Sequence, residues 1–277
     1  MQPEGVSARA GIASAASGLS PVSDTPRLDA ELLMAHAIGI SREALLLGGL
    51  DRSMPDAFLP LLERRLRGEP LAYITGHRAF WTIDVAVAPG VLIPRPDSET
   101  LIEAAVEHFH GTPGPRRILD LGTGSGALLL AALAEWPEAS GVGIDRSHDA
   151  LAIARANAER LGMAERAEMI AGDWAGTGES FELILCNPPY IGTSEPLPRD
   201  VVEHEPHGAL YAGPDGLDDY RAIAPLLPGQ LAAGGVACIE IGATQGPAVS
   251  ALIVAQGLVV HIRHDLAGRD RCVVAKR

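Results

Sequence analysis

The feature that most constrains this fold is a regular alternation of strand-like and helical runs from residue 98 onward. A chain that repeats strand, helix, strand builds a parallel sheet covered by helices on both faces. The last two strands are joined only by His264–Asp270, which leaves no room for a crossover helix, so we expect them to pair antiparallel. The sequence therefore predicts an α/β fold with a doubly wound, mostly parallel sheet of seven strands. The expected strands are 116–121, 140–145, 167–171, 181–186, 235–241, 258–263 and 271–276, and the expected helices are 98–109, 126–135, 148–161, 216–227 and 246–256.

The first third of the sequence has a different pattern. Residues 7–72 follow a helical period and predict a small bundle that packs mainly through Leu and Ala. Residues 73–93 change to a period of two, and Pro89-Gly90 supplies the turn of a predicted β-hairpin. We therefore expect three parts, which are an N-terminal helical bundle over 1–75, a β-hairpin linker over 76–94 and a large α/β domain over 95–277.

The charge balance narrows the possible partners. The chain has 22 Lys and Arg against 35 Asp and Glu, a net charge of −13. Proteins that hold phosphate backbones normally carry a basic footprint, so we expect no direct nucleic-acid binding. Lys276 is the only lysine, near the end of the sequence. Its position argues against a Walker-type phosphate loop, a Schiff-base enzyme and a lysine general base.

Apolar patterning points away from membranes. The longest uninterrupted apolar run is Ala127–Ala134, eight residues, whereas a span needs about 20. The first twenty residues lack the basic start and the apolar stretch of a signal peptide. We therefore expect a cytoplasmic monomer with no membrane partner.

The three cysteines lack metal-ligand spacing and are interpreted as buried thiols, at Cys186, Cys238 and Cys272.

A glycine-rich turn follows the first strand of the large domain and opens directly into a helix; its residues are Gly122, Thr123, Gly124, Ser125 and Gly126. Glycines allow the backbone to approach a ligand closely and point helix N–H groups at it. The next strand ends in Asp145, whose carboxylate can accept hydrogen bonds from a ribose diol. The turn also fits the dinucleotide signature G-x-G-x-x-A, so the residues alone leave the nucleotide cofactor open.

Asp173 and Trp174 follow the third strand. An aspartate can accept a hydrogen bond from an exocyclic adenine amine, and an indole can cover a ring face. The alternative is a helix cap followed by a buried tryptophan. Because ligands of open α/β sheets bind at the carboxyl ends of the strands, the position favours ligand contact.

The fourth strand ends in Asn187-Pro188-Pro189-Tyr190. Two prolines exclude both helix and sheet ladder, so the chain leaves the sheet stiffly and the Pro188 carbonyl has no obvious main-chain partner. The Asn187 side chain adds a second acceptor, and Tyr190 adds a flat face. Two acceptors and a stacking plane suit a planar –NH2 group, such as a carboxamide or an aminopurine edge. A rigid turn alone would explain the prolines but not their neighbours.

The segment His204-Glu205-Pro206-His207 has two histidines and a carboxylate, which are common zinc ligands. Pro206 prevents a regular helix there, and no third ligand is obvious. We interpret the segment as a solvated loop near the substrate entrance and expect no metal.

Together these motifs resemble those of the protein-(glutamine-N5) methyltransferases that modify peptide-chain release factors, the PrmC or HemK family. ILDLGTGSG is similar to the first motif of S-adenosylmethionine methyltransferases in general, and NPPY to the motif of enzymes that methylate planar nitrogens. The resemblance covers about residues 25–277, in the ordered blocks TPRLDAELLMAHAIG, RGEPLAYITGHRAFW, VLIPRPDSE, EPHGALYAGPDGLDDYR, CIEIGATQG and DLAGRDRCVVAK.

The resemblance implies a Rossmann-like methyltransferase sheet, S-adenosylmethionine as cofactor with S-adenosylhomocysteine as product, and class 1 release factors as the protein substrate. The N-terminal bundle would help to recognise the release factor. Arg95–Glu99 would help to close the cofactor pocket, although a capped helix start with Asp97 or Ser98 as N-cap is an equal alternative. The family would assign Gly122–Gly126 to the methionine part, Asp145 to the ribose, and Asp173 with Trp174 to the adenine. It would assign binding of the substrate glutamine to Asn187, Pro188, Pro189 and Tyr190. Asn187 would also lie near the cofactor. The catalytic residues would be Asn187, Pro188 and Tyr190.

Two other functions compete with this interpretation. A nucleic-acid adenine-N6 methyltransferase would use the same Asn-Pro-Pro-Tyr turn, but it needs a basic face or a recognition domain. An NAD-dependent oxidoreductase would use Gly122–Ala127 for the pyrophosphate, but it leaves Asn187–Tyr190 without a role.

Overall fold

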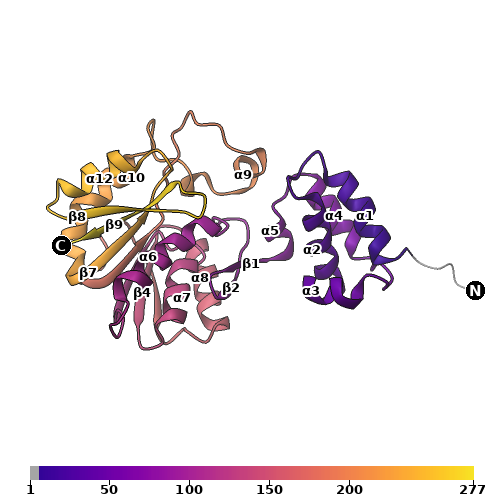
Figure 1. Ribbon diagram of the computed structural model, residues 1–277, viewed down its shortest axis with the longest axis horizontal. Helices are drawn as coiled ribbons and strands as arrows, with labels where there is room; N and C mark the ends of the chain where they lie inside the picture. Colours follow the sequence, from indigo (N-terminus) through magenta and orange to yellow (C-terminus); the bar gives the residue numbers. More distant parts are fainter. Residues whose placement is uncertain (1–5) are drawn as a thin grey trace, which may run out of the picture. The chain divides into compact units, whose positions relative to one another are not determined.

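A computed structural model describes residues 6–277, so the first five residues of the predicted bundle lie outside it (Figure 1). The chain forms two compact units. The first comprises the sequence up to Gly76 together with Pro198–His204, and the second comprises His77–Leu197 and Glu205–Arg277.

The first unit is helical. Ser7 caps its first helix by accepting a hydrogen bond from the Ala10 N–H, and the second helix ends at Gly39 in the left-handed conformation. The Asp29–Arg65 ion pair, at 2.8 Å, joins the second helix to the fourth and is almost fully buried. The elements are α1 (Ala8–Leu19), α2 (Pro26–Ile38), α3 (Arg42–Ala44), a π-helical turn (Leu45–Gly49), α4 (Phe58–Leu66), α5 (Leu71–Thr75) and, from the later segment, α9 (Arg199–His204).

The core of this unit is mainly Leu, Ala and Ile, as the sequence predicts, with one large aromatic side chain, Phe58.

No single helix within residues 6–277 is both long and apolar enough to cross a membrane. Only Pro26–Ile38 taken together with Arg42–Gly49, two helices that meet at a 96° bend, reaches that length and composition.

The second unit contains a sheet of seven strands in the order β5-β4-β3-β6-β7-β9-β8. The first five of these pair parallel, and β9 pairs antiparallel with both of its neighbours. The predicted doubly wound sheet with an antiparallel edge is therefore confirmed. The strands are β3 (Arg117–Leu121), β4 (Ser140–Asp145), β5 (Ala167–Ala171), β6 (Phe181–Cys186), β7 (Leu231–Glu240), β8 (Val259–His264) and β9 (Asp270–Lys276).

Helices flank the sheet (Figure 1). Side chains of α10 and α12 pack with Leu119, Leu121 and Ile144 in one core cluster. Because neighbouring residues of a strand point to opposite faces, Ile118 faces the other way, and α7 contacts β3, β4 and β5. The sequence order of the sheet changes direction between β3 and β6, which is where open α/β sheets bind ligands. The helices are α6 (Glu99–Phe109), α7 (Ala127–Glu135), α8 (His148–Arg160), α10 (Asp218–Ile223), α11 (Leu227–Gln230) and α12 (Gly246–Val254).

The predicted hairpin forms, but its turn was placed wrongly at Pro89-Gly90. Strand β1 (His77–Phe80) pairs antiparallel with β2 (Ile83–Ala86), so the chain reverses at Trp81. Trp81 has a φ of 53°, in the left-handed region that favours glycine. Its N–H donates to Glu99 Oε1 at 2.9 Å, which stabilises a turn that lacks a glycine.

The predicted helix 216–227 is divided. It consists of α10, a 3₁₀ turn over Ala224–Leu226 and α11, because Pro225 and Pro228 have no N–H to continue a helical ladder. Strand β7 starts directly afterwards at Leu231, four residues before the predicted start.

Candidate functional site

A cavity of about 230 Å³ lies at the carboxyl ends of β3, β4, β5 and β6, within the second unit. This position is the edge at which the sequence places its ligand residues. Of the predicted site residues, seven line the cavity: Gly122, Gly124, Asp145, Asp173, Trp174, Asn187 and Pro189. Further lining residues come from segments 90–92, 144–150 and 206–209.

Two positions of the glycine-rich turn require glycine, because their φ is positive and neighbouring side chains leave little room for a Cβ. Gly122 has a φ of 75°, and a Cβ there would lie 3.3 Å from the Trp174 ring. Gly126 has a φ of 83°, and its Cβ would meet Ala154 at 3.3 Å. At Gly124 a Cβ would meet nothing within 4 Å, so the turn is open toward the cavity there. The backbone of this turn can therefore come into direct contact with a ligand.

The remaining residues of the turn, Thr123 and Ser125, are buried and do not line the cavity. The Thr123 hydroxyl donates to Asp120 Oδ2 at 2.6 Å, and the Leu129 N–H donates to the same oxygen at 3.3 Å. The Ser125 carbonyl accepts from the Asn157 side chain at 2.9 Å. Hydrogen bonds with Asp120 and Asn157 therefore fix the conformation of the turn.

Asp120 is fully buried, and burial raises the pKa of its carboxyl to about 7. Its Oδ1 has no hydrogen-bond partner among the described residues. In the unfolded chain the group has an ordinary pKa near 3.8. Between these two values the folded protein holds a proton that the unfolded chain has released.

We therefore expect the free energy of unfolding to fall as the pH rises from about 4 through 7, by about 4 kcal/mol at most from this group. In the Asp120→Asn variant this part of the pH dependence should disappear, because asparagine keeps an acceptor for Thr123 and cannot ionise. Urea denaturation of both proteins at pH 5, 6, 7 and 8 measures the difference. Equal pH slopes for the two proteins would contradict the assignment.

Asp145 holds the turn and the start of α8 at the same time. Its Oδ2 accepts from the Gly124 N–H at 2.9 Å, and its Oδ1 accepts from the Ser147 N–H at 2.8 Å. The side chain is half-buried and lines the cavity. Both oxygens keep further acceptor capacity for a ligand hydroxyl group.

Trp174 and Asp173 behave differently. The Trp174 indole N–H donates to Asp219 at 3.0 Å, and Gln230 donates to the Trp174 carbonyl at 2.8 Å, so this residue is fixed at both ends. Asp173 is exposed, and its Oδ1 accepts from the Ala175 N–H at 2.9 Å. Asp173 therefore stabilises a local turn with one oxygen and faces the cavity as a lining residue.

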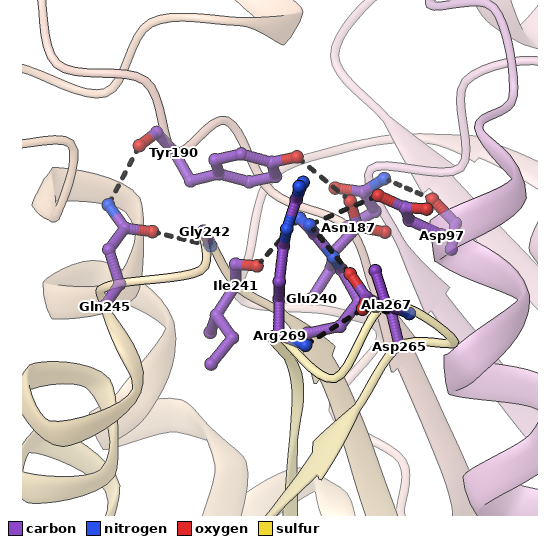
Figure 2. A network of polar contacts seen from close by, with 12 residues as sticks. Asp97, Asn187, Tyr190, Glu240, Ile241, Gly242, Gln245, Asp265, Ala267 and Arg269 are labelled. Carbon is purple, nitrogen blue, oxygen red and sulfur yellow. Dashed lines mark hydrogen bonds and ion pairs between the residues drawn. The ribbon is translucent and has the colours of Figure 1, made fainter.

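The Asn-Pro-Pro-Tyr turn is held at three points (Figure 2). The Asn187 amide N–H2 donates to Ser98 Oγ at 3.2 Å. The Tyr190 hydroxyl donates to Glu240 Oε1 at 3.1 Å, and Gln245 donates to the Tyr190 carbonyl at 2.9 Å. In the described part of the chain no group donates to the Pro188 carbonyl oxygen. Pro188 is buried, and neither it nor Tyr190 lines the cavity.

Segment 95–99 makes tertiary contacts, and neither Asp97 nor Ser98 caps α6 through its side chain. Ser98 occupies the N-cap position of α6, as the alternative expects, but its hydroxyl makes no capping hydrogen bond. Asp97 pairs with Arg271 at 3.2 Å, and Arg95 pairs with Glu205. Residues 96–98 form a 3₁₀ turn that brings Ser98 to Asn187.

The interpretation of 204–207 as a solvated loop is wrong for Glu205, which is only 4% exposed. Its Oε2 accepts from the Ile93 N–H at 3.1 Å, and its Oε1 binds Arg95. These contacts connect the cavity-lining residues around Leu92 with those around Pro206. His204, in contrast, is the last residue of α9.

Sequence reasoning missed Glu240 as a part of this site, and it placed Ser98 only within the segment Arg95–Glu99, without its contact to Asn187. A signal for Glu240 exists, since it is the single charged residue in the apolar run from Val236 to Ile241. Arg146, which donates to the Gly208 carbonyl and lines the cavity, was missed as well. Its partner lies 62 residues away in the sequence, so no local pattern marks it.

Two parts of the chain match known protein-family models. Residues 12–76 match the family model described as PrmC N-terminal domain. Residues 97–201, which include the glycine-rich turn and the Asn-Pro-Pro-Tyr turn, match the model described as methyltransferase small domain.

Two curated relatives cover nearly the whole chain, and both are named release factor glutamine methyltransferase. The protein from Rhodospirillum rubrum is 43% identical, over 92% of this chain and 80% of its own. The protein from Cereibacter sphaeroides is 44% identical, over 91% of this chain and 92% of its own. Among solved structures, a methyltransferase from Pyrococcus furiosus has a TM-score of 0.53 at 17% identity, over 71% of this chain and 89% of that one. This last similarity shows the fold.

Proposed function

Since the chain belongs to the release factor glutamine methyltransferase family, we propose that it methylates a glutamine side chain of class 1 peptide-chain release factors. The methyl group comes from S-adenosylmethionine and goes to the amide nitrogen N5 of the glutamine in the Gly-Gly-Gln motif. The product of the cofactor is S-adenosylhomocysteine.

One observation carries this proposal beyond family membership. At the end of β6, Asn187 donates its amide N–H2 to Ser98, so its Oδ1 is left to accept from a ligand. The neighbouring Pro188 carbonyl has no donor within residues 6–277. Two acceptors on a stiff turn match the two N–H bonds of a primary carboxamide.

The residues around the cavity fit S-adenosylmethionine. The open backbone at Gly124 suits the methionine part, and the Asp145 carboxylate suits the ribose diol. The fixed indole of Trp174 offers an apolar face for adenine, beside Asp173 as an acceptor. We assign Gly122, Thr123, Ser125 and Gly126 to shaping the turn that holds the cofactor.

An amide nitrogen is a poor nucleophile because its lone pair is delocalised into the carbonyl group. When bound, S-adenosylmethionine supplies an activated methyl group on a sulfonium, so the protein supplies placement. Asn187 Oδ1 and the Pro188 carbonyl accept the two N–H bonds of the substrate and turn the nitrogen toward the methyl group. Orientation of this kind can contribute about 7–11 kcal/mol. The same two oxygens stabilise the positive charge that develops on nitrogen. The proton leaves after the nitrogen has become cationic, so no base is required before attack.

The substrate class also bears on the rest of the chain. We assign the N-terminal helical unit a part in recognising the release factor, supported by its match to the PrmC N-terminal domain. Because release factors act in translation, we infer that the protein works in the cytoplasm.

The decisive experiment uses intact-protein and peptide mass spectrometry of a purified class 1 release factor after incubation with the enzyme and S-adenosylmethionine. We expect a gain of about 14 Da, the mass of one CH2 group, on the glutamine of the Gly-Gly-Gln motif.

A release factor with asparagine in place of that glutamine is the matched control and should gain no mass. An adenine-containing oligonucleotide tests the competing nucleic-acid activity in the same assay. Methylation of the oligonucleotide and not of the release factor would overturn the proposed function.

A further inference from the structure

A buried carboxylate lies beside the Asn-Pro-Pro-Tyr turn, at the carboxyl end of β7 (Figure 2). Glu240 is only 1% exposed, in a strand that is otherwise apolar from Val236 onward. Its Oε1 accepts from the Tyr190 hydroxyl at 3.1 Å. Burying a carboxylate is costly unless donors surround it, so apolar packing would be better served by a different residue.

Ser98 connects this carboxylate to Asn187. A serine hydroxyl has one proton, and Ser98 Oγ uses an acceptor position for the Asn187 N–H2. Its proton is thus available to Glu240, and a hydrogen bond from Ser98 opposes the rise of the Glu240 pKa. The second carboxylate oxygen, Oε2, is buried and has no hydrogen-bond partner within residues 6–277, so it has an acceptor position that the Ser98 proton can fill.

Whether Ser98 donates its proton to Glu240 or to Asn187 decides which end of the Asn187 amide faces the substrate. If Ser98 donates to Glu240, it can only accept from Asn187, and Asn187 must present N–H2 to Ser98 and Oδ1 to the opposite side. If Ser98 were free to donate to Asn187 instead, the amide could rotate and present N–H2 to the substrate. That orientation would place two donors against each other at the reacting nitrogen.

We propose that Glu240 is a positioning residue for the methyl transfer: it holds the Ser98 and Tyr190 hydroxyl groups and thereby fixes Asn187 with its oxygen toward the substrate amide. This inference rests on the proposed function, because it assigns Glu240 a part in that same reaction. Glu240 acts through Ser98 and Asn187 and touches neither the substrate nor the cavity, since it is not among the lining residues.

The surroundings of Glu240 set the pH at which this arrangement holds. Burial raises the pKa of Glu240, and Asp97 raises it further, whereas Ser98, Arg271 and Tyr190 lower it. The Arg271 guanidinium also forms ion pairs with two other carboxylates, Asp97 at 3.2 Å and Asp265 at 3.3 Å. The titratable groups that face Glu240 are Asp97 before α6, Cys186 of β6, Tyr190 after β6, Tyr220 of α10, and Arg271 and Cys272 of β9.

As the pH falls through the raised pKa, Glu240 gains a proton and no longer draws the Ser98 proton. We therefore expect kcat of the wild-type enzyme to fall on the acid side, at a pH above the ordinary range of a glutamate. The Glu240→Gln variant has nearly the same volume and does not titrate. Its kcat should be about 10- to 100-fold lower than that of the wild type, and this acid limb should be absent.

The test measures kcat against pH for wild type, Glu240→Gln, Ser98→Ala and the double variant with saturating S-adenosylmethionine and release factor. The affinity for S-adenosylmethionine, from calorimetry, should change by less than about threefold in each variant. Ser98→Ala should lose as much kcat as Glu240→Gln, and the double variant no more than either, because the two residues act as one unit. Glu182→Gln is the control, since Glu182 lies at the opposite end of β6 and accepts from the Arg116 and Arg117 N–H groups.

A kcat of Glu240→Gln close to wild type, or an acid limb retained at the same pH, would overturn the inference. If Glu240→Gln does not fold by thermal melting, Ser98→Ala and Tyr190→Phe decide, and near wild-type kcat in both overturns it. A wild-type enzyme that fails to methylate the release factor would instead remove the proposed function, and this inference with it.

Discussion

The Asn187→Ala variant is expected to lose methyl transfer by about 1,000-fold or more while still binding S-adenosylmethionine. The variant removes the side-chain acceptor at the end of β6, the group that Ser98 orients. Without it, only the Pro188 carbonyl remains to hold the substrate amide, and the nitrogen is free to turn away from the methyl group. Single-turnover kinetics with a release factor, together with calorimetric titration of the cofactor, measures both quantities.

The cofactor titration distinguishes a lost reaction from a lost fold. Gln256→Ala is a matched control, because it removes an amide whose hydrogen bond goes to the Leu252 carbonyl within the α12 region. That variant should keep wild-type turnover. Turnover of Asn187→Ala within about tenfold of wild type would contradict the proposed mechanism.

The opposite result is expected for Asp145→Ala, which should weaken the binding of S-adenosylmethionine by about 100-fold. Asp145 fixes Gly124 with one oxygen and Ser147 with the other, and the residue lines the cavity. The variant loses the proposed ribose contact and loosens the glycine-rich turn, and two hydrogen bonds to a charged group are together worth about 3 kcal/mol. At saturating cofactor, kcat should stay within about threefold, because the proposed substrate acceptors that follow β6 remain.

Asp149→Ala is the control for this variant. Asp149 is an exposed carboxylate in the first turn of α8, four residues further on, and it does not line the cavity. Its removal should leave the cofactor affinity unchanged. An affinity for S-adenosylmethionine in Asp145→Ala equal to that of Asp149→Ala would show that Asp145 holds no part of the cofactor.

Local patterns predicted the sheet well because its central strands β3, β4 and β6 are mostly buried. Strands β4, β5 and β6 have the predicted bounds to the residue. The hairpin turn could not be predicted in the same way. Trp81 adopts a positive φ that its residue type disfavours, and its N–H donates a stabilising hydrogen bond to Glu99, 18 positions away.

The candidate site shows the same division. Its glycine-rich turn and its Asn-Pro-Pro-Tyr turn are recognisable because each carries its chemistry in consecutive residues. The Ser98–Asn187 contact spans 89 positions and the Tyr190–Glu240 contact spans 50. Glu205 was misinterpreted because a charged residue between histidine and proline is typical of a solvated loop, whereas Arg95, 110 positions away, makes its burial possible. Such pairs depend on the fold and are not visible in the sequence.

The most direct measurement is a crystal structure of the enzyme with S-adenosylhomocysteine and a release factor fragment that contains the Gly-Gly-Gln loop. We predict that the glutamine N5 atom donates one hydrogen bond to Asn187 Oδ1 and one to the Pro188 carbonyl, with the sulfur of the cofactor in line beyond it. A glutamine amide held by other groups, or an Asn187 amide that presents its N–H2 to the substrate, would contradict the account.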